Sequence, residues 1–192
     1  VAAEGSVREL LDAAGPTELG ALTRVVTAGL DIEDVIRGAA ERGIAAMNVY
    51  GSSEVFAFAG ISEPGASAAA RAMPGGRVTV PETRVRVVDP ETGLVLPLGS
   101  VGELQFSGPT VFLSYLRNDA ATAASRTPDG WFRTGDSARL IDDRTFCYLA
   151  RANDTLRLGG YSVSPADVET TIEELDGVRQ AQVVGVRDPR SG

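Results

Sequence analysis

The chain has 192 residues, 43% of them hydrophobic, which is enough to bury the core of one ordinary domain or of two small ones. Its formal net charge of −8 argues against a nucleic-acid partner, because such binding needs a basic face that displaces phosphate counterions. No apolar run reaches the roughly 18 residues of a membrane span, and Val1–Gly5 lacks the character of a signal peptide, so we expect a cytoplasmic protein without a transmembrane segment.

Three residue types are scarce or missing, and each limits the available chemistry. Cys147 is the single cysteine, so an internal disulfide is excluded and we expect it to pack within a strand. The chain contains no histidine, which excludes the usual zinc sites and any histidine-based triad. All 18 basic residues are arginine, so these residues offer no lysine-dependent mechanism.

The first fifty residues alternate between helical and strand patterns. Apolar residues at helical spacing predict a helix over Ser6–Ala14. We expect a short strand over Leu22–Thr27, a helix that begins after Asp31, and a second strand over Ile44–Val49. This succession indicates a parallel unit, and in open α/β sheets ligands bind beyond the carboxyl ends of such strands. The segment Tyr50–Glu54 occupies that position.

The middle of the chain has a β-rich pattern. Gly60–Gly76 is rich in Gly, Ala, Ser and Pro, which predicts a loop that leads into a new subdomain. We also expect a short helix over Asn118–Ser125, followed by a turn over Thr127–Gly130. Strands are predicted over Val78–Val80, Thr83–Val88, Val101–Ser107, Thr110–Leu116 and Thr145–Ala150. For this region the pattern predicts a small antiparallel β-barrel or a distorted sheet.

The last forty residues change character again. Thr155–Leu158 and Tyr161–Val163 predict a hairpin. Pro165 predicts the first turn of a helix that ends before Gly177. A final strand is expected over Val178–Val186.

The run Gly130–Asp136 combines residue types that suit a nucleotide. Gly135 allows a sharp turn or a close approach to a ligand, and the carboxylate of Asp136 can accept two hydrogen bonds from a vicinal diol such as ribose. Arg151 carries a permanent charge that binds phosphate bidentately. Together they would form a nucleotide clamp, whereas in isolation they also fit an ordinary turn and a solvated charge.

Four ordered blocks of the sequence resemble the adenylate-forming superfamily, which contains acyl- and aryl-CoA ligases, luciferases and the adenylation domains of peptide synthetases. The blocks are Tyr50–Glu54, Gly102–Leu104 with Gly108 and Tyr115, Trp131–Asp136, and Arg151–Glu169. The resemblance implies a mixed α/β (α+β) fold with three parts. Residues 1–61 would be a parallel αβ remnant of the large domain, 62–152 a β-rich subdomain with the nucleotide-binding motif, and 153–192 the start of a small α+β C-terminal lid domain.

The resemblance also implies roles for individual residues. Glu54 is implied as the magnesium ligand, which agrees with the preference of Mg²⁺ for one or two carboxylates together with phosphate oxygens and water. Asp136 is implied to bind ribose, and Arg151 ribose and phosphate, so that Glu54 and Arg151 are the catalytic pair. The implied cofactor-binding residues are Gly29, Tyr50, Gly51, Ser53, Asp136, Arg151 and Gly160.

Some positions depart from the family's pattern. Ser53 stands where Thr is usual, but either hydroxyl can donate to a phosphate. Ala150 replaces the glycine that usually precedes the arginine, and Asn153 stands at the family's hinge, where Asp or Lys is more usual. Asn tolerates left-handed conformations, so it suits a pivot. Gly159 and Gly160 resemble the loop that swings to the acceptor thiol in CoA ligases, or form a simple hairpin turn.

The function implied is that of an ATP-dependent carboxylic acid–CoA ligase that works through an acyl-adenylate. It would use ATP or AMP, Mg²⁺ and coenzyme A, and its partner would be a small carboxylic acid. The family's phosphate loop and C-terminal catalytic lysine have no counterpart in this sequence, so we expect an internal fragment that is inactive on its own. Two alternatives remain, an adenylation domain that loads a carrier protein and a non-catalytic β-rich interaction module.

Overall fold

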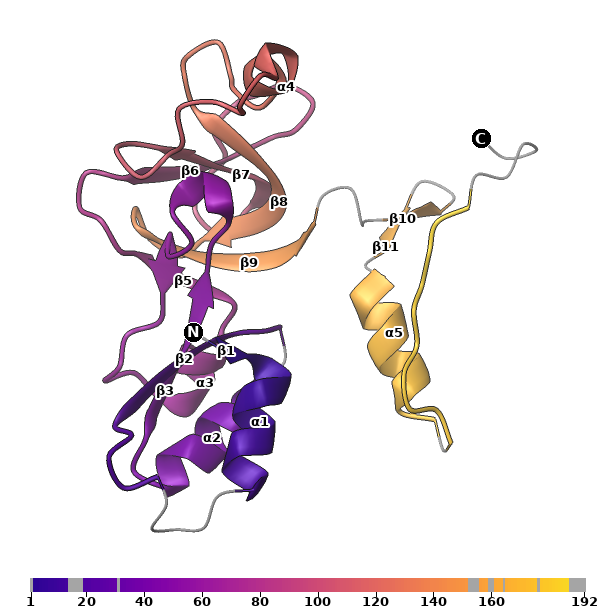
Figure 1. Ribbon diagram of the computed structural model, residues 1–192. Helices are drawn as coiled ribbons and strands as arrows, with labels where there is room; N and C mark the ends of the chain where they lie inside the picture. Colours follow the sequence, from indigo (N-terminus) through magenta and orange to yellow (C-terminus); the bar gives the residue numbers. More distant parts are fainter. Residues whose placement is uncertain are drawn as a thin grey trace.

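The computed structural model describes residues 2–13, 19–30, 32–151, 156–158, 161–163, 165–175 and 177–186. Within these ranges a nine-stranded mixed sheet runs through most of the chain, and a two-stranded hairpin follows it (Figure 1). In spatial order the strands of the large sheet are β1 (Ala2–Ala3), β2 (Arg24–Ala28), β3 (Ala45–Tyr50), β4 (Gly60–Ile61), β5 (Gly75–Val78), β9 (Thr145–Arg151), β8 (Phe132–Leu140), β7 (Val101–Ser107) and β6 (Arg84–Val88). The sheet is open, with β1 and β6 at its edges, so the predicted distorted sheet is right and the alternative barrel is not formed.

The strands β2 and β3 form the predicted parallel unit, and β1, which the sequence analysis did not predict, adds a third parallel strand. β1 pairs with β2, and β2 with β3, in parallel register, and the helices α1 (Glu4–Ala13) and α2 (Glu33–Glu41) connect them. The apolar faces of the helices close a core that contains Val7, Leu11, Val35, Ile36, Ala39, Ile44 and Ala46. Asp31, the expected cap of α2, lies outside the described residues.

The segment predicted as a loop over Gly60–Gly76 instead carries regular elements, and that prediction is wrong. It contains β4, the helix α3 (Ala68–Ala72) and the start of β5. Ser67 caps α3 through its side chain. Gly75 lies in β5 with φ of 106°, and a Cβ there would lie 2.4 Å from the carbonyl oxygen of Phe146. The glycine therefore allows β9 to approach, rather than making the chain flexible.

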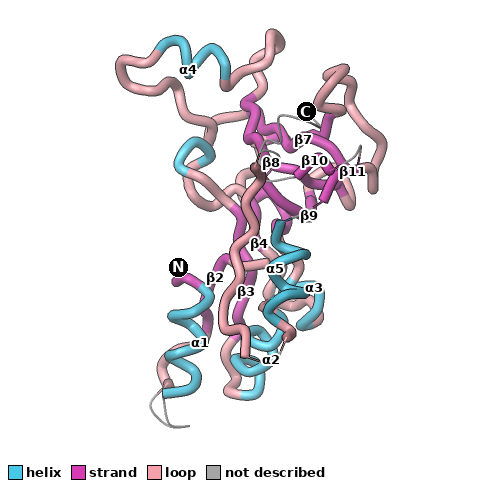
Figure 2. Tube along the Cα trace, turned by 90° about the vertical axis from the view of Figure 1, so that its right-hand side faces the viewer, coloured by secondary structure: helices cyan, strands magenta, loops and turns pink. Residues whose placement is uncertain are grey.

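The strands from β3 through β4 and β5 to β9, β8, β7 and β6 pair antiparallel. Their core is aromatic and aliphatic, with Phe106, Phe132, Phe146, Val87 and Leu104 buried together. The predicted short helix is present as α4 (Asp119–Ala124), and Figure 2 places it at the opposite end of the molecule from α1, α2 and α3.

Thr110–Leu116 is not a strand, and that prediction is wrong. Its backbone groups bind partners outside any ladder. The amide of Phe112 donates to the carbonyl oxygen of Glu54 at 2.8 Å, and the guanidinium of Arg126 donates to the carbonyl oxygens of Phe112 and Leu113. The segment is an irregular loop that packs against the sheet.

Near the C-terminus the predicted hairpin is confirmed as β10 (Leu156–Leu158) paired antiparallel with β11 (Tyr161–Val163), and α5 (Pro165–Glu173) begins at the expected proline. The predicted strand over Val178–Val186 is wrong, since residues 177–186 contain no strand. The amides of Ala181 and Val183 donate to the carboxylates of Glu173 and Glu169 on α5, at 2.8 and 2.7 Å. The segment returns beside α5 (Figure 1). Among the helices that the structure describes, none is long and apolar enough to cross a membrane.

Candidate nucleotide-binding site

A cavity of about 350 Å³ lies where the parallel strands meet the antiparallel ones. β3 ends beside it, and β8 and β9 form its other wall, because Asp136 and Arg151 are register partners on these two strands. Five of the predicted residues line it together, namely Gly29, Tyr50, Gly51, Asp136 and Arg151. Residues separated by up to about 120 positions in the sequence thus converge on one cavity, at the carboxyl end of a parallel strand as expected.

Asp136 is the buried charge of this cavity, with a relative exposure of 3%. Its Oδ1 accepts a hydrogen bond from Nη1 of Arg151 at 2.9 Å, and its Oδ2 accepts one from the hydroxyl of Tyr50. Its backbone amide donates to Oγ1 of Thr134 at 3.0 Å. A buried carboxylate needs such partners, because leaving it unpaired away from water is costly.

Arg151 covers the carboxylate from the solvent side, with 54% of its side chain exposed. The negative charge of Asp136 raises the pKa of Arg151, so the guanidinium stays charged. The exposed part of the guanidinium remains within reach of an anion that enters from solvent. The arrangement therefore combines a buried acceptor for hydroxyl groups with an accessible cation for phosphate.

Tyr50 closes the cavity with an aromatic ring. The ring packs against Phe106, Phe146 and Tyr148, with centroid distances of 6.1, 5.2 and 5.5 Å. Burial, followed by the nearby charge of Asp136, raises the pKa of the Tyr50 phenol. The phenol thus stays protonated and acts as the donor to Asp136. A flat ring fixed by three aromatic neighbours is suited to stacking against a base.

Asn48 is a lining residue that the sequence analysis missed. It is 1% exposed, and its side-chain amide donates to the carbonyl oxygens of Gly29 and Ala72, both at 2.9 Å. Asn48 thereby fixes Gly29, which follows β2, against β3. The available signal was a polar residue inside the otherwise apolar run that precedes Tyr50.

Gly51 lines the cavity, and the packing of the chain also requires a glycine at this position. A Cβ at Gly51 would lie 2.0 Å from the carbonyl oxygen of Ala57, so the chain can fold back only if this residue is glycine.

Glu54 and Ser53 lie on the short 3₁₀ helix η1 (Ser53–Val55), outside the lining of the cavity. Oε1 of Glu54 accepts a hydrogen bond from the hydroxyl of Tyr115 at 2.9 Å. Burial raises the pKa of Glu54, but hydrogen bonds from Ser52, from its own amide and from Tyr115, together with the charge of Arg151, outweigh this and lower the pKa. The carboxylate is thus kept ionised, and Ser53 is exposed beside it.

The fit of Glu54 to a magnesium ion follows from its chemistry. The described residues contain no group of three or more His, Cys, Asp or Glu side chains that could form a complete protein cage. Mg²⁺ usually binds one or two carboxylates and takes its other ligands from phosphate and water, so one ionised glutamate near this cavity suits it. The predicted residue Gly160, and with it Gly159 and Asn153, lies outside the described residues.

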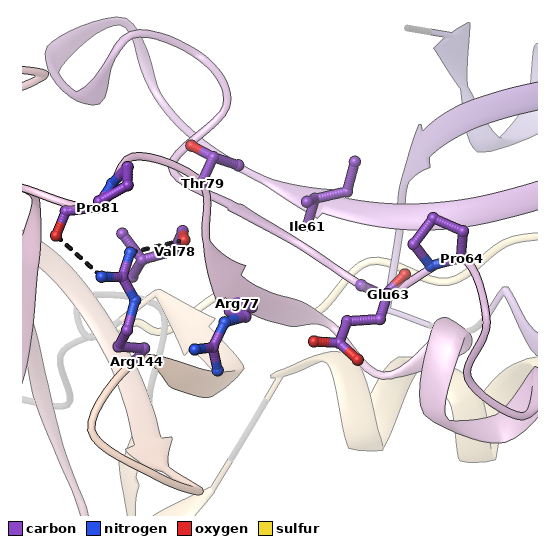
Figure 3. A pocket seen from close by; sticks show the side chains of 9 residues that line it. Ile61, Glu63, Pro64, Arg77, Val78, Thr79, Pro81 and Arg144 are labelled. Atoms are coloured by element: carbon purple, nitrogen blue, oxygen red, sulfur yellow. Dashed lines mark hydrogen bonds between the residues drawn. The ribbon is translucent and has the colours of Figure 1, made fainter.

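A second cavity, of about 430 Å³, lies beside β4 and β5 (Figure 3). Arg144 lines it, and its guanidinium donates to the carbonyl oxygens of Pro81, Val78 and Val80 at 2.9, 3.2 and 3.0 Å. Arg77 lies between Arg144 and Glu63 in this view (Figure 3). None of the predicted site residues is among its nine lining residues, and Arg144 holds the end of β5 and the residues that follow it.

Comparison with known proteins shows which family this chain resembles in sequence and in structure. A family model described as AMP-binding enzyme matches residues 5–116. The mitochondrial medium-chain acyl-CoA ligase ACSF2 of Danio rerio is 40% identical over 113 residues, 58% of this chain and 18% of that protein. The 4-coumarate–CoA ligase-like 4 of Oryza sativa subsp. japonica is 31% identical over 180 residues, 92% of this chain and 32% of that protein. O-succinylbenzoate coenzyme A synthetase of Bacillus subtilis, solved with AMP, shares the fold with a TM-score of 0.82 at 23% identity, over 98% of this chain and 38% of that one.

The family model covers more than half of the sequence, and the chain therefore belongs to the AMP-binding enzyme family. This confirms the resemblance inferred from the four sequence blocks. The chain spans about a third or less of the length of the curated relatives named above.

Proposed function

We propose that the chain is part of an ATP-dependent carboxylic acid–CoA ligase that forms an acyl-adenylate and releases AMP. The observation that carries this proposal is the carboxylate of Asp136, buried between Tyr50 and Arg151 on one wall of the cavity. A buried acceptor pair beside an aromatic ring and an accessible cation suits the ribose, base and phosphate of a nucleotide. The two CoA ligases named above support coenzyme A as the acceptor.

The reaction consists of two displacements. In the first, an oxygen of the acid attacks the α-phosphorus of ATP, the bond to the β-phosphate breaks, and pyrophosphate leaves. In the second, the sulfur of CoA attacks the acyl carbon, the thiol proton is lost, and AMP leaves with the bonding electrons. Neither step needs a covalent bond to the protein. The task of the residues is therefore to position the reacting groups and to neutralise the charge of the phosphates.

The roles of the residues follow from their places. Asp136 would accept the ribose hydroxyls, Tyr50 would stack against adenine, and Gly29 and Gly51 would allow the backbone to approach the base. Arg151 would give up part of its contact with Asp136 and bind the phosphates of the nucleotide instead.

Glu54 would hold a magnesium ion, with Ser53 donating to a phosphate oxygen. Bound Mg²⁺ would neutralise the phosphates and stabilise the pyrophosphate leaving group.

The domain arrangement is part of the same proposal. Residues 1–61 and 62–152 would belong to the large domain, and residues 153–192 would begin a lid that pivots near Asn153 and brings Gly160 toward the acceptor thiol. A cytoplasmic location stays a prediction.

The test is a panel of carboxylic acids with ATP and CoA, applied to the complete gene product, with AMP release and thioester formation measured. Formation of both products with one class of acid would support the proposal. Acid-dependent pyrophosphate exchange without a CoA thioester would favour a domain that loads a carrier protein. Failure to bind ATP would contradict the proposal and favour a non-catalytic module.

A further inference from the structure

Glu54 is held by a part of the chain far from it in sequence. The amide of Phe112 donates to its carbonyl oxygen at 2.8 Å, and the hydroxyl of Tyr115, 61 residues away, donates to its Oε1 at 2.9 Å. The first bond fixes the backbone of Glu54, and the second fixes one oxygen of its carboxylate. Both come from the irregular loop over residues 108–118, which we call the Tyr115 loop.

The Tyr115 loop is itself fixed at several points. The amide of Tyr115 donates to Oγ1 of Thr122 on α4 at 2.9 Å. The guanidinium of Arg126 donates to the carbonyl oxygen of Phe112 and lies 5.2 Å from the centroid of its ring. The rings of Phe112 and Tyr115 pack with their centroids 4.7 Å apart, and Phe112 packs in turn on Phe132 of the core at 5.4 Å. The Tyr115 hydroxyl is therefore presented to Glu54 from a supported position.

A hydrogen bond to one oxygen limits how a carboxylate can rotate. An ionised carboxylate has about four acceptor positions, so binding the Tyr115 hydroxyl leaves others for a cation. Mg²⁺ demands near-octahedral geometry, so the orientation of each carboxylate that binds it matters. Partners that orient a metal ligand in this way typically affect metal affinity by about 10- to 100-fold when removed.

We propose that Tyr115 is a positioning residue that orients the Glu54 carboxylate toward the magnesium ion of the nucleotide complex. This inference rests on the proposed function of Glu54 and adds a residue that makes no direct contact with the ion. The Tyr115 loop would connect the magnesium position to α4 and to the core of the antiparallel strands.

The test uses Mn²⁺ as the probe, titrated into the complete gene product with saturating ATP and followed by electron paramagnetic resonance. Tyr115→Phe keeps the ring that packs on Phe112 and removes only the donor. We expect it to raise the Kd for Mn²⁺ by about 10- to 100-fold, with Glu54→Gln causing a larger increase. ATP binding measured in EDTA should be unchanged in Tyr115→Phe, which also shows that this variant is folded.

Two further variants make the test specific. Ser114→Ala removes one hydroxyl from an exposed neighbour in the same loop and should leave the Kd for Mn²⁺ unchanged. Thr122→Val removes the acceptor of the Tyr115 amide and should raise this Kd by a smaller factor than Tyr115→Phe. If Tyr115→Phe binds Mn²⁺ as the parent does while Glu54→Gln does not, the inference about Tyr115 is overturned. If Glu54→Gln also binds normally, the proposed role of Glu54 fails instead.

Discussion

The two parts of the proposed site are held in different ways. Asp136 and Arg151 are opposite residues of the paired strands β8 and β9, so a ladder of backbone hydrogen bonds sets their separation. Glu54 lies on the 3₁₀ helix η1, and the two residues that follow this helix, Phe56 and Ala57, both have φ of 61°, a region that residues with a side chain rarely adopt. A ladder spreads the positioning over many bonds, whereas the turn depends on a few contacts. We therefore expect the Asp136 side to tolerate nearby substitutions better than the Glu54 side.

The largest expected effect concerns catalysis by the isolated chain, which contains both the Glu54 side and the Asp136 side of the proposed site. The isolated 192-residue chain contains Glu54, Asp136 and Arg151, but it contains no lysine and spans a third or less of its relatives. Loss of even one preorganised donor at a reacting phosphate or carbonyl typically costs about 10² to 10³ in rate. We expect no measurable acid-dependent exchange of pyrophosphate into ATP by the isolated chain, with the complete gene product as the positive control. Clear exchange by the chain alone would contradict the proposed dependence on missing groups.

The second prediction concerns Asp136, on the side of the proposed site that lies on the paired strands β8 and β9. Asp136→Ala removes the charged acceptor for the ribose hydroxyls, an interaction worth about 1.5 to 3 kcal/mol. In the complete gene product the Kd for ATP, measured by calorimetry, should rise by about 10- to 100-fold at that energy. Asp129→Ala is the matched control, because Asp129 also pairs with an arginine, Arg86, but on the surface and away from this cavity. Equal loss of ATP binding in both variants would argue against a specific clamp.

A third substitution addresses the proposed pivot after β9. Asn153→Pro fixes φ and removes an amide donor, which should favour one orientation of the lid. Single-turnover measurements should show thioester formation slowed by about tenfold or more, while pyrophosphate exchange changes little. Asn153→Ala, which keeps the amide and the freedom of φ, serves as the control. Equal slowing of both half-reactions by the proline variant would place the pivot elsewhere.

The smallest effect concerns the bond between Tyr50 and Asp136. Tyr50→Phe keeps the ring but leaves Oδ2 of a buried carboxylate without its donor, so the free energy of unfolding should fall by about 1 kcal/mol. The Kd for ATP should change less than about threefold, because a ribose hydroxyl can replace the phenol as donor. Denaturant titrations with and without ATP would separate the two quantities. A loss of ATP affinity as large as that of Asp136→Ala would show that the phenol itself belongs to the nucleotide contact.

The sequence predicted which residues lie together better than it predicted the elements that carry them. The resemblance of Tyr50, Asp136 and Arg151 to the family's nucleotide-binding residues implied that they lie together, and the structure places them around one cavity. Their binding of a nucleotide stays a prediction. Thr110–Leu116 was predicted as a strand because its residues are β-branched and aromatic, but its amides and carbonyls bind Glu54 and Arg126. Such long-range partners leave no periodic signal.

The same limit explains two other errors. Val178–Val186 has a strand-like composition, yet in the described residues its amides bind carboxylates of α5 instead of a neighbouring strand. Gly75 has the appearance of a loop residue, although its lack of a Cβ serves the approach of Phe146, some seventy positions away. Local composition shows what a backbone can adopt, and tertiary packing decides which option is taken.

The place of the cavity has a consequence for how the molecule unfolds. Gly29 and Tyr50 lie at the carboxyl ends of the parallel strands β2 and β3, whereas Asp136 and Arg151 lie on the antiparallel strands β8 and β9. The two-residue strand β4 joins the two regions in the sheet. A nucleotide that contacts all four residues would bind only when both regions are folded, so its binding free energy would stabilise both at once. Without the nucleotide, we expect the parallel and antiparallel regions to open more independently in hydrogen exchange, and with it to open as one cooperative unit.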